Sequence, residues 1–175
     1  GEHTVYNALA GAAVGRCYGL SLEEIKRGIE SQRSVSGRFH IIETGKYTII
    51  DDCYNANPVS VKASLKVLQD AAGRKIAVLG DMGELGEDEI SLHRQVGSFA
   101  ASCHIQLLIC VGELSKYMAE AAKEENPQLE VVYIKSREGL LEKLPGMIRE
   151  GDTLLIKASH FMGFEKVVEL LAPEQ

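Results

Sequence analysis

The feature that most constrains the fold is a regular alternation of short apolar segments with amphipathic ones from about residue 58 to residue 171. The apolar segments are four or five residues long and lie at residues 75–79, 107–111, 131–134 and 153–156. The amphipathic segments repeat their apolar residues every three or four positions and begin near residues 58, 88, 114, 137 and 164. Parallel strands that are covered on both faces consist of unbroken apolar runs. The alternation therefore predicts an α/β, Rossmann-like fold, in which a mostly parallel sheet carries helices on both faces.

The N-terminal part of the chain follows other patterns. Small and apolar residues at helical spacing predict a helix over about residues 3–15, and a capping box that begins at Ser21 starts a second helix. Further along, residues 38–51 alternate with a period of two around a turn, which predicts a β-hairpin. We therefore expect two domains, residues 1–36 and residues 37–175.

Composition and charge exclude several classes of protein. The chain has 175 residues, of which 45% are hydrophobic and 25% charged, as in globular proteins. The 19 Lys and Arg against 25 Asp and Glu give a net charge of −6, which argues against a nucleic acid or an anionic membrane surface as a partner. No apolar run approaches the roughly 20 residues that a membrane span needs. The chain starts without an initiator Met or a signal-peptide pattern, and we expect it to be a piece of a longer chain.

The cysteines and histidines show no metal-binding pattern. None of the four cysteines stands in a C-x-x-C pair, and their neighbours are apolar, which predicts reduced, buried thiols in a cytoplasmic protein. The five histidines do not combine with these cysteines at zinc spacing, so we expect no metal site.

Polar residues gather where predicted strands end, which is where ligands bind in open parallel sheets. Residues 51–58 place two carboxylates, a phenol and two amides before a helix, and Asp52 is a candidate to accept ribose hydroxyl protons. Asn57 in this segment also has a simpler interpretation, as the cap of the helix that Pro58 begins. The segment therefore predicts a ligand site, a helix cap or both.

Three further positions have open interpretations. Residues 80–86 hold three glycines at steps of three, which let the backbone approach a ligand or another domain, or which make only a sharp acidic loop. Lys157 and Ser159 end the last strand, and they could hold a carboxylate or phosphoryl oxygen, although a Lys at a strand end can also be merely solvated. Arg38 could reach a phosphate held by a neighbouring domain, or it could be a surface charge.

Taken together, these segments resemble those of the Mur ligases. The resemblance is carried, in order, by Gly-Glu-His-Thr-Val-Tyr-Asn-Ala-Leu-Ala at residues 1–10, Gly-Arg at 37–38, Asp-Cys-Tyr-Asn-Ala-Asn-Pro at 52–58, Ala-Val-Leu-Gly-Asp-Met-Gly-Glu-Leu-Gly at 77–86 and Lys-Ala-Ser at 157–159. The strings at 54–58 and 80–86 are most similar to the member of that family that adds D-alanyl-D-alanine. At three positions the chain departs from the common family pattern. Thr4 stands where Asn is frequent and Ala158 where Gly is frequent. His160 stands where Arg is frequent, so a cation there depends on pH.

The resemblance implies an enzyme of three domains, which bind the UDP-sugar, hold ATP through a P-loop and form a Rossmann-like C-terminal domain. Residues 1–36 would be the closing helices of the central ATPase domain, and residues 37–175 would be the C-terminal domain. With ATP and Mg²⁺, whose ligands would lie mostly on the other domains, such an enzyme phosphorylates the terminal carboxylate of UDP-N-acetylmuramoyl-tripeptide. The amine of D-Ala-D-Ala then attacks the acyl phosphate. The product is a peptidoglycan precursor, and the chain alone is expected to be inactive.

The resemblance also implies roles for individual residues. On the nucleotide side, Asn7 would contact the adenine with His3 nearby, Arg38 would reach the ATP phosphates and Asp52 would take the ribose hydroxyls. Catalytic roles on the tripeptide or acyl-phosphate side are implied for Lys157 and Ser159. The walls of the dipeptide or nucleotide pocket are implied for Asn55 and Asn57.

Two alternative functions stay open. One is a stand-alone module that binds a nucleotide or peptide without chemistry, and the other is a related ligase such as a folylpolyglutamate synthetase. The Tyr-Asn-Ala-Asn-Pro string at residues 54–58 favours the D-Ala-D-Ala ligase over the second. All ligase hypotheses require Arg38, Asp52 and Lys157 to share one face of the sheet.

Overall fold

The computed structural model describes residues 2–31 and 36–173, with side chains from Val5 onward in the first segment. The chain divides into two compact units, residues 1–34 and residues 35–175. The domain boundary that the sequence predicts lies beside residues 32–35, which are outside the described residues. The assignment of the first unit to a separate ATPase domain stays a prediction.

The first unit is a pair of helices, α1 (Glu2–Cys17) and α2 (Leu22–Glu30). The predicted capping box at the start of α2 is confirmed: the Ser21 hydroxyl accepts from the Glu24 N–H, and the Glu24 carboxylate accepts from the Ser21 N–H at 2.8 Å. The Ser21 hydroxyl also donates to the Glu24 carboxylate at 2.7 Å, and this bond, followed by the one from the Ser21 N–H, lowers the pKa of Glu24. The helices approach closely at Gly15, where a Cβ would lie 2.9 Å from the Ile25 side chain.

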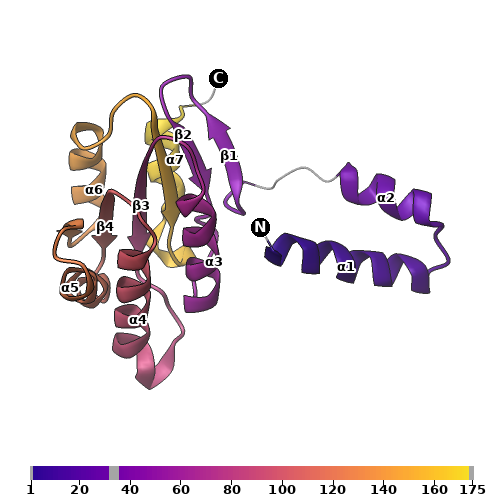
Figure 1. Cartoon of the computed structure of the whole chain (residues 1–175), viewed down its shortest axis with the longest axis horizontal. Coiled ribbons are helices and arrows are strands. Elements are labelled where there is room, and N and C mark those ends of the chain that lie inside the picture. Colours follow the sequence, from indigo (N-terminus) through magenta and orange to yellow (C-terminus); the bar gives the residue numbers. More distant parts are fainter. Residues whose placement is uncertain (1, 32–35, 174–175) are drawn as a thin grey trace. The chain divides into compact units, whose positions relative to one another are not determined.

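The second unit is the predicted α/β fold, and Figure 1 shows its sheet with helices on both sides. The strand order is β1-β2-β6-β3-β4-β5. Strand β1 pairs antiparallel with β2 as the predicted hairpin, and the other neighbours are parallel. The strands are β1 (His40–Glu43), β2 (Thr48–Asp51), β3 (Arg74–Gly80), β4 (Leu107–Val111), β5 (Glu130–Ile134) and β6 (Asp152–Lys157). The last strand of the chain therefore occupies the middle of the sheet, between β2 and β3.

In the described part of the second unit, four α-helices and two short 3₁₀ turns connect the strands, and a further turn and a fifth helix follow β6. The helices are α3 (Pro58–Gln69), α4 (Glu89–Ser102), α5 (Ser115–Glu125), α6 (Arg137–Lys143) and α7 (Glu165–Leu171). The turns are η1 (Gly86–Asp88), η2 (Leu144–Gly146) and η3 (His160–Met162), which the sequence patterns did not predict. Each helix lies within a few residues of its predicted bounds, because the apolar periodicity and the caps are local signals.

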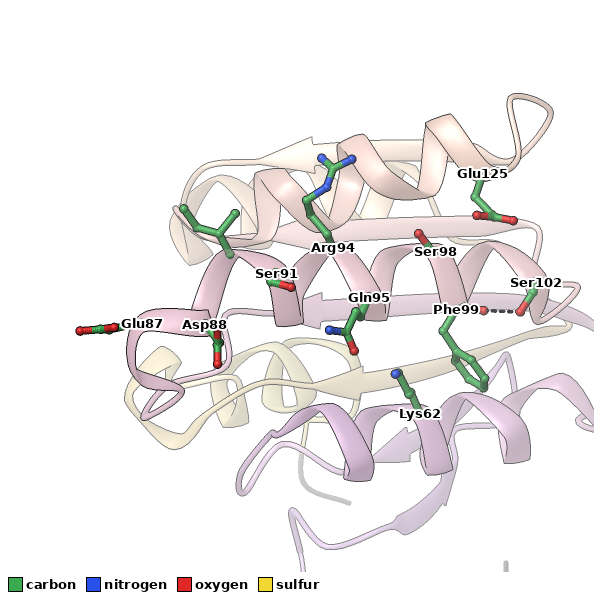
Figure 2. Close-up of a pocket in the computed structure, with 11 residues that line it drawn as sticks. Lys62, Glu87, Asp88, Ser91, Arg94, Gln95, Ser98, Phe99, Ser102 and Glu125 are labelled. Carbon is green, nitrogen blue, oxygen red and sulfur yellow. Dashed lines mark hydrogen bonds between the residues drawn. The ribbon is translucent and has the colours of Figure 1, made fainter.

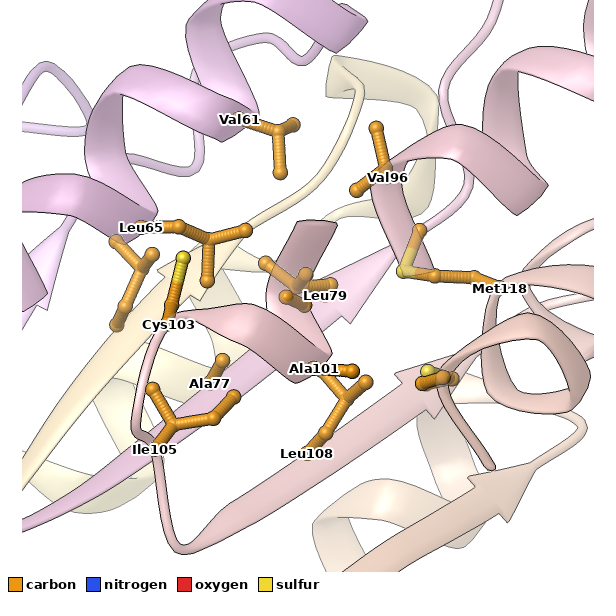
Figure 3. Packing of buried hydrophobic residues seen from close by; sticks show 14 of the residues in the cluster. Val61, Leu65, Ala77, Leu79, Val96, Ala101, Cys103, Ile105, Leu108 and Met118 are labelled. Atoms are coloured by element: carbon orange, nitrogen blue, oxygen red, sulfur yellow. The ribbon is translucent and has the colours of Figure 1, made fainter. Parts of the chain in front are cut away.

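The core has two halves, one on each face of the sheet. Helices α3, α4 and α5 cover one face, and Figure 3 shows Leu65, Val96 and Met118 from these helices around Leu79 of β3. Helices α6 and α7 cover the other face. Alternate residues of β3 from Ile76 to Leu79 face opposite clusters, which explains why this part of the strand is an unbroken apolar run. The edge strand β5 is less covered than predicted, and Tyr133 is 40% exposed.

The cysteine prediction is wrong for one residue. Cys53, Cys103 and Cys110 are buried free thiols, and burial raises the pKa of each. Cys17 is exposed, because it ends helix α1 on a side that the two-helix unit leaves uncovered. Among the described residues, no helix is both long and apolar enough to cross a bilayer.

Candidate active site

The predicted polar residues of the second unit meet at the carboxyl edge of the three adjacent strands β2, β6 and β3. Lys157 ends β6 in register with Leu79 of β3, and the Asp52 N–H donates to the carbonyl of Ile156 at 3.0 Å. The Ser159 N–H donates to the carbonyl of Asp81 at 3.1 Å. Since parallel strands end at the same edge of a sheet, three loops that are distant in sequence are joined here.

A buried ion pair lies at the centre of this edge. The Lys157 ammonium is 2.6 Å from Asp52 Oδ2, and the two side chains are 3% and 15% exposed. The ammonium also donates to the backbone carbonyl of Asn55 at 2.9 Å and to that of Asp52 at 3.4 Å. Its three N–H groups therefore all have acceptors within the chain.

The Asp52 carboxylate is equally well partnered. Its Oδ1 accepts from the Phe39 N–H at 3.1 Å, and its Oδ2 accepts from the Ser64 hydroxyl at 2.7 Å in addition to Lys157. A single carboxylate thus ties the approach to β1, helix α3 and strand β6 together. Ribose hydroxyls, the predicted ligands of Asp52, would have to share these oxygens with donors already present.

The neighbouring Asp51 holds the segment that carries Arg38. Asp51 is 1% exposed, and its Oδ2 accepts from the Gly37 N–H at 2.6 Å. Gly37 has φ 76°, and its carbonyl accepts from the Tyr54 N–H at 2.8 Å. The Arg38 guanidinium lies 4.1 Å from the centre of the Tyr54 ring, a cation–π distance. Arg38 therefore shares the face of Asp52 and Lys157, as the ligase hypotheses require, and its side chain is exposed.

Ser159 joins the second and third loops. Its hydroxyl accepts from the Gly83 N–H at 2.8 Å and donates to the carbonyl of Ala56 at 3.3 Å. Because Ser159 is only 4% exposed, its hydroxyl makes these two bonds within the chain and offers little surface to a ligand. A Cβ on Gly83 would lie 2.9 Å from the Phe161 ring, and glycine here permits a close approach of these two loops.

These loops enclose a hollow of about 340 Å³. Its lining residues are Tyr54, Asn55, Gly83, Glu84, Ser159, His160 and Phe161. Tyr54 is 50% and Phe161 67% exposed, so two aromatic side chains stand open to solvent at its walls. The lining also contains one acidic side chain, Glu84, and one basic side chain, His160. The centres of the His160 and Tyr54 rings are 5.8 Å apart. The hollow can therefore take a small ligand with both apolar and charged parts.

The structure separates the two predicted asparagines. Asn55 lines the hollow, whereas Asn57 caps helix α3: its side-chain oxygen accepts from the Ser60 N–H at 2.9 Å. The Ser60 hydroxyl in turn accepts from the Asn57 N–H. The helix-cap interpretation of Asn57 is confirmed, and its role in a ligand pocket stays a prediction.

The glycine-containing loop after β3 is held from within the chain. The Asp81 carboxylate accepts from the Ser115 N–H and hydroxyl, both at 2.7 Å, and from the Leu114 N–H. It thereby caps α5, which has no side-chain cap of its own. The Met82 N–H donates to Nε2 of the fully buried His93, and with Nε2 as acceptor, the Nδ1–H of His93 donates to the carbonyl of Glu89.

The remaining candidates lie elsewhere. Asn7 is an exposed residue of α1, and His3 belongs to the same helix with its side chain outside the described residues.

A larger hollow of about 830 Å³ runs along α4, where Figure 2 shows Arg94, Gln95 and Lys62. It is open, and none of the predicted site residues lines it. Within residues 2–31 and 36–173, no three His, Cys, Asp or Glu side chains gather as metal ligands.

Sequence reasoning assigned no individual role to four residues that line the hollow or support its loops: Tyr54, Glu84, Phe161 and His93. Tyr54 and Glu84 stand inside strings that the sequence analysis singled out, but their exposure could not be read from the strings. Phe161 lies in η3, a few positions after the end of β6, so its only local signal was its place near a strand end. His93 sits on the buried side of α4 and has no such signal.

The comparisons with known proteins agree on one group. A family model described as "Mur ligase, glutamate ligase domain" matches residues 37–160. The UDP-N-acetylmuramoyl-tripeptide--D-alanyl-D-alanine ligase of Bacillus subtilis is 32% identical over 97% of the chain and 38% of its own length. The same ligase of Escherichia coli is 33% identical over 98% and 37%.

Solved structures give the same result. MurF from Acinetobacter baumannii superposes with a TM-score of 0.90 at 31% identity, over 99% of this chain and 38% of that one. MurF from Thermotoga maritima in complex with ADP gives 0.73 at 26% identity, over 90% of this chain and 35% of that one. The chain thus spans about 38% of the length of the relatives that it matches.

Proposed function

The chain belongs to the Mur ligase family, and from this we propose that it forms the C-terminal part of a ligase that adds D-alanyl-D-alanine to UDP-N-acetylmuramoyl-tripeptide in peptidoglycan precursor synthesis. The observation that carries the proposal is the convergence of Asp52, Asn55, Lys157 and Ser159 at the carboxyl edge of the sheet, beside a hollow that Asn55 and Ser159 line. The curated relatives with this activity support it, because they are similar over nearly the whole chain.

The chemistry of amide ligation fits this arrangement. ATP activates a carboxylate as an acyl phosphate, and an amine must then be held close to the acyl carbon for attack. We propose that the hollow holds the dipeptide, with Glu84 as acceptor for its amine end and with His160 and Asn55 facing its carboxylate end. The exposed methyl groups of D-Ala-D-Ala would pack against Tyr54 and Phe161. Once bound in this way, the amine is presented in a fixed orientation, and bulk water is kept from the acyl phosphate.

We propose that residues 1–36 belong to the central ATPase domain of the same enzyme. The supporting observation is the exposure of large apolar side chains on this two-helix unit, including Tyr6 at 64%, Leu9 at 59% and Leu22 at 72%. Two short helices with uncovered apolar side chains need further packing partners to be stable. In this proposal His3 and Asn7 contact the nucleotide from α1.

ATP is proposed as the second substrate, and the ADP complex of the Thermotoga maritima relative supports a nucleotide site. Arg38 is the group of this chain that we assign to the phosphates, because its guanidinium is exposed at the edge that carries the hollow. We assign no Mg²⁺ ligand to the described residues, since no acidic cluster is present among them. The reaction is proposed to take place in the cytoplasm.

The test is an assay of ADP release by the full-length protein that contains this chain. We expect turnover only when ATP, UDP-N-acetylmuramoyl-tripeptide and D-Ala-D-Ala are all present, and none from the 175-residue chain alone. A second assay supplies glutamate in place of D-Ala-D-Ala and a folate as the carboxylate substrate. ADP release in this second assay would indicate the related ligase, a folylpolyglutamate synthetase, in place of the proposed one. Nucleotide or peptide binding without turnover under any combination would contradict the proposal and favour the binding-module alternative.

A further inference from the structure

We propose that Lys157 is a positioning residue, which holds the loop of residues 52–57 against strand β6 and does not contact the substrate. The inference rests on the proposed function for the identity of the ligand in the hollow. It differs from the role that the family resemblance implies, in which Lys157 acts on the acyl-phosphate side.

The first argument is that every N–H group of the Lys157 ammonium already has an acceptor within the chain. The ammonium donates to Asp52 Oδ2 at 2.6 Å, to the carbonyl of Asn55 at 2.9 Å and to that of Asp52 at 3.4 Å. The residue is 2% exposed and does not line the hollow. A substrate oxygen could reach the ammonium only by displacing one of these acceptors.

The second argument concerns charge. A cation stabilises developing negative charge through its field, but Asp52 lies in contact with Lys157 and carries the opposite charge. At any point several ångströms away, the two contributions largely cancel. The pair is therefore a poor source of positive potential for a phosphoryl group or an oxyanion. Among residues 2–31 and 36–173, no carboxylate forms an ion pair with Arg38, whose guanidinium lies over the Tyr54 ring, and Arg38 is the better candidate for that task.

The third argument is what Lys157 holds. Two successive carbonyls of the loop, those of Asn55 and Ala56, accept from Lys157 and Ser159, which point to the same side of the chain two positions apart. Tyr54 and Asn55 form one wall of the hollow. Lys157 thus stands behind this wall and fixes where its two exposed side chains lie.

The decisive experiment is a double-mutant cycle in the full-length ligase, with Lys157→Met, Asp52→Asn and both together. We expect each single variant to raise the KM for D-Ala-D-Ala by about tenfold or more with a smaller fall in kcat, because the wall is displaced and the chemistry is not. We expect the double variant to lose no more than the worse single variant, because it buries no unpaired charge. Lys135→Met, which removes one partner of an exposed ion pair, is the matched control and should change neither constant.

A direct contact with the reacting groups would give another pattern. The loss in the double variant would then equal the product of the two single losses, and Lys157→Met would lower kcat at unchanged KM. That result would overturn the inference.

A second measurement separates this inference from the proposed function. Amide hydrogen exchange of the 175-residue chain should be faster by about tenfold or more at residues 53–57 in Lys157→Met than in the parent, with β4 unchanged. If Lys157→Met does not fold, amide exchange at residues 53–57 is compared between the double variant and Asp52→Asn alone, and it should again be faster in the protein that lacks Lys157. Unchanged exchange at residues 53–57 would overturn the positioning role whether or not the enzyme uses D-Ala-D-Ala. An absence of ligase activity in the parent, together with faster exchange in the variant, would overturn only the proposed function.

Discussion

Strands β2 and β3, which flank β6 in the sheet, are each followed by a largely buried carboxylate, and the two carboxylates are stabilised in different ways. Asp52, after β2, is paired with the ammonium of Lys157, which lies at the end of another strand. Asp81, after β3, is 6% exposed and accepts only from neutral donors, the N–H groups and hydroxyl at the start of α5. The helix dipole there favours an anion without any cation.

The surroundings of the two carboxylates differ as much as their partners do. Beside Asp52, the side chains of Arg38, Tyr54 and Asn55 stay exposed around a hollow. Directly after Asp81, the loop is closed by the bond from Met82 to the buried His93, and only its later residues Gly83 and Glu84 reach the hollow. An acidic residue at a strand end is therefore no sign of a ligand site by itself. What distinguishes the Asp52 edge is the set of unburied polar and aromatic groups that its ion pair supports.

The largest effect on stability is expected from breaking the ion pair. Lys157→Met leaves the Asp52 carboxylate buried without its cation, and the free energy of unfolding should fall by about 3–5 kcal/mol. Adding Asp52→Asn should recover a good part of this loss. Urea unfolding of the chain, followed by circular dichroism, measures both. Equal stability of Lys157→Met and the parent would mean that the pair is not desolvated as the structure indicates.

A smaller loss is expected from the other carboxylate. Asp81→Ala removes the cap of α5 and leaves three donors of Leu114 and Ser115 without their acceptor, which should cost about 2–3 kcal/mol. Because the Asp81 partners are neutral, no second substitution should rescue the loss, in contrast to the ion pair. Urea unfolding of Asp81→Ala alone and with Ser115→Ala provides the comparison. A substantial recovery of the free energy of unfolding in the double variant would show that the two carboxylates respond in the same way to loss of a partner.

Two native thiols report on the two edges separately. Burial raises the pKa of Cys53, next to Asp52, and of Cys110, on β4 near Asp81, so both stay protonated and unreactive at pH 8. We expect iodoacetamide to label Cys17 in the folded parent, and Lys157→Met to accelerate labelling of Cys53 but not of Cys110. Mass spectrometry of digested samples follows each site. Parallel acceleration at both cysteines would indicate global unfolding instead of loosening at one edge.

The smallest change in stability is expected at the wall of the hollow. His160 is exposed, so His160→Ala should alter the free energy of unfolding by less than about 0.5 kcal/mol while raising the KM for D-Ala-D-Ala severalfold in the full-length enzyme. Lys135→Met, equally exposed but away from the hollow, should leave both quantities unchanged. A stability loss in His160→Ala as large as that of Asp81→Ala would show that the wall is structural, as the Asp81 loop is.

Much of the architecture could be predicted from local signals. The strand at Leu107–Val111 was predicted with its observed bounds, and the caps at Ser21 and Asn57 were predicted residue by residue, since apolar runs and capping motifs act over a few positions. The order of the strands is a tertiary property, and periodicity contains no information on it. Cys17 was predicted to be buried because its neighbours are apolar, but a helix face needs a partner to bury it.

In the candidate site, too, some features could be predicted from the sequence, whereas others depend on tertiary structure. That Asp52 and Lys157 share an edge follows from the rule that parallel strands end together. That they neutralise each other, and that Asp81 caps a helix beginning 34 positions later, depends on distances that only the folded chain sets. The sequence therefore predicted where the groups would gather, and the structure was needed to tell which of them remain available.

The position of β6 has a consequence for how this chain is made. Since β6 leaves the ribosome after the other five strands of this sheet and yet pairs with both β2 and β3, each of those two strands presents an open edge to solvent until residue 157 has emerged. Unpaired strand edges invite association between nascent chains. Completion of the sheet, and with it the assembly of the Asp52 edge, must therefore wait until residue 157 has been synthesised. A truncation before residue 152 removes a central strand of the second unit along with the lysine of the ion pair.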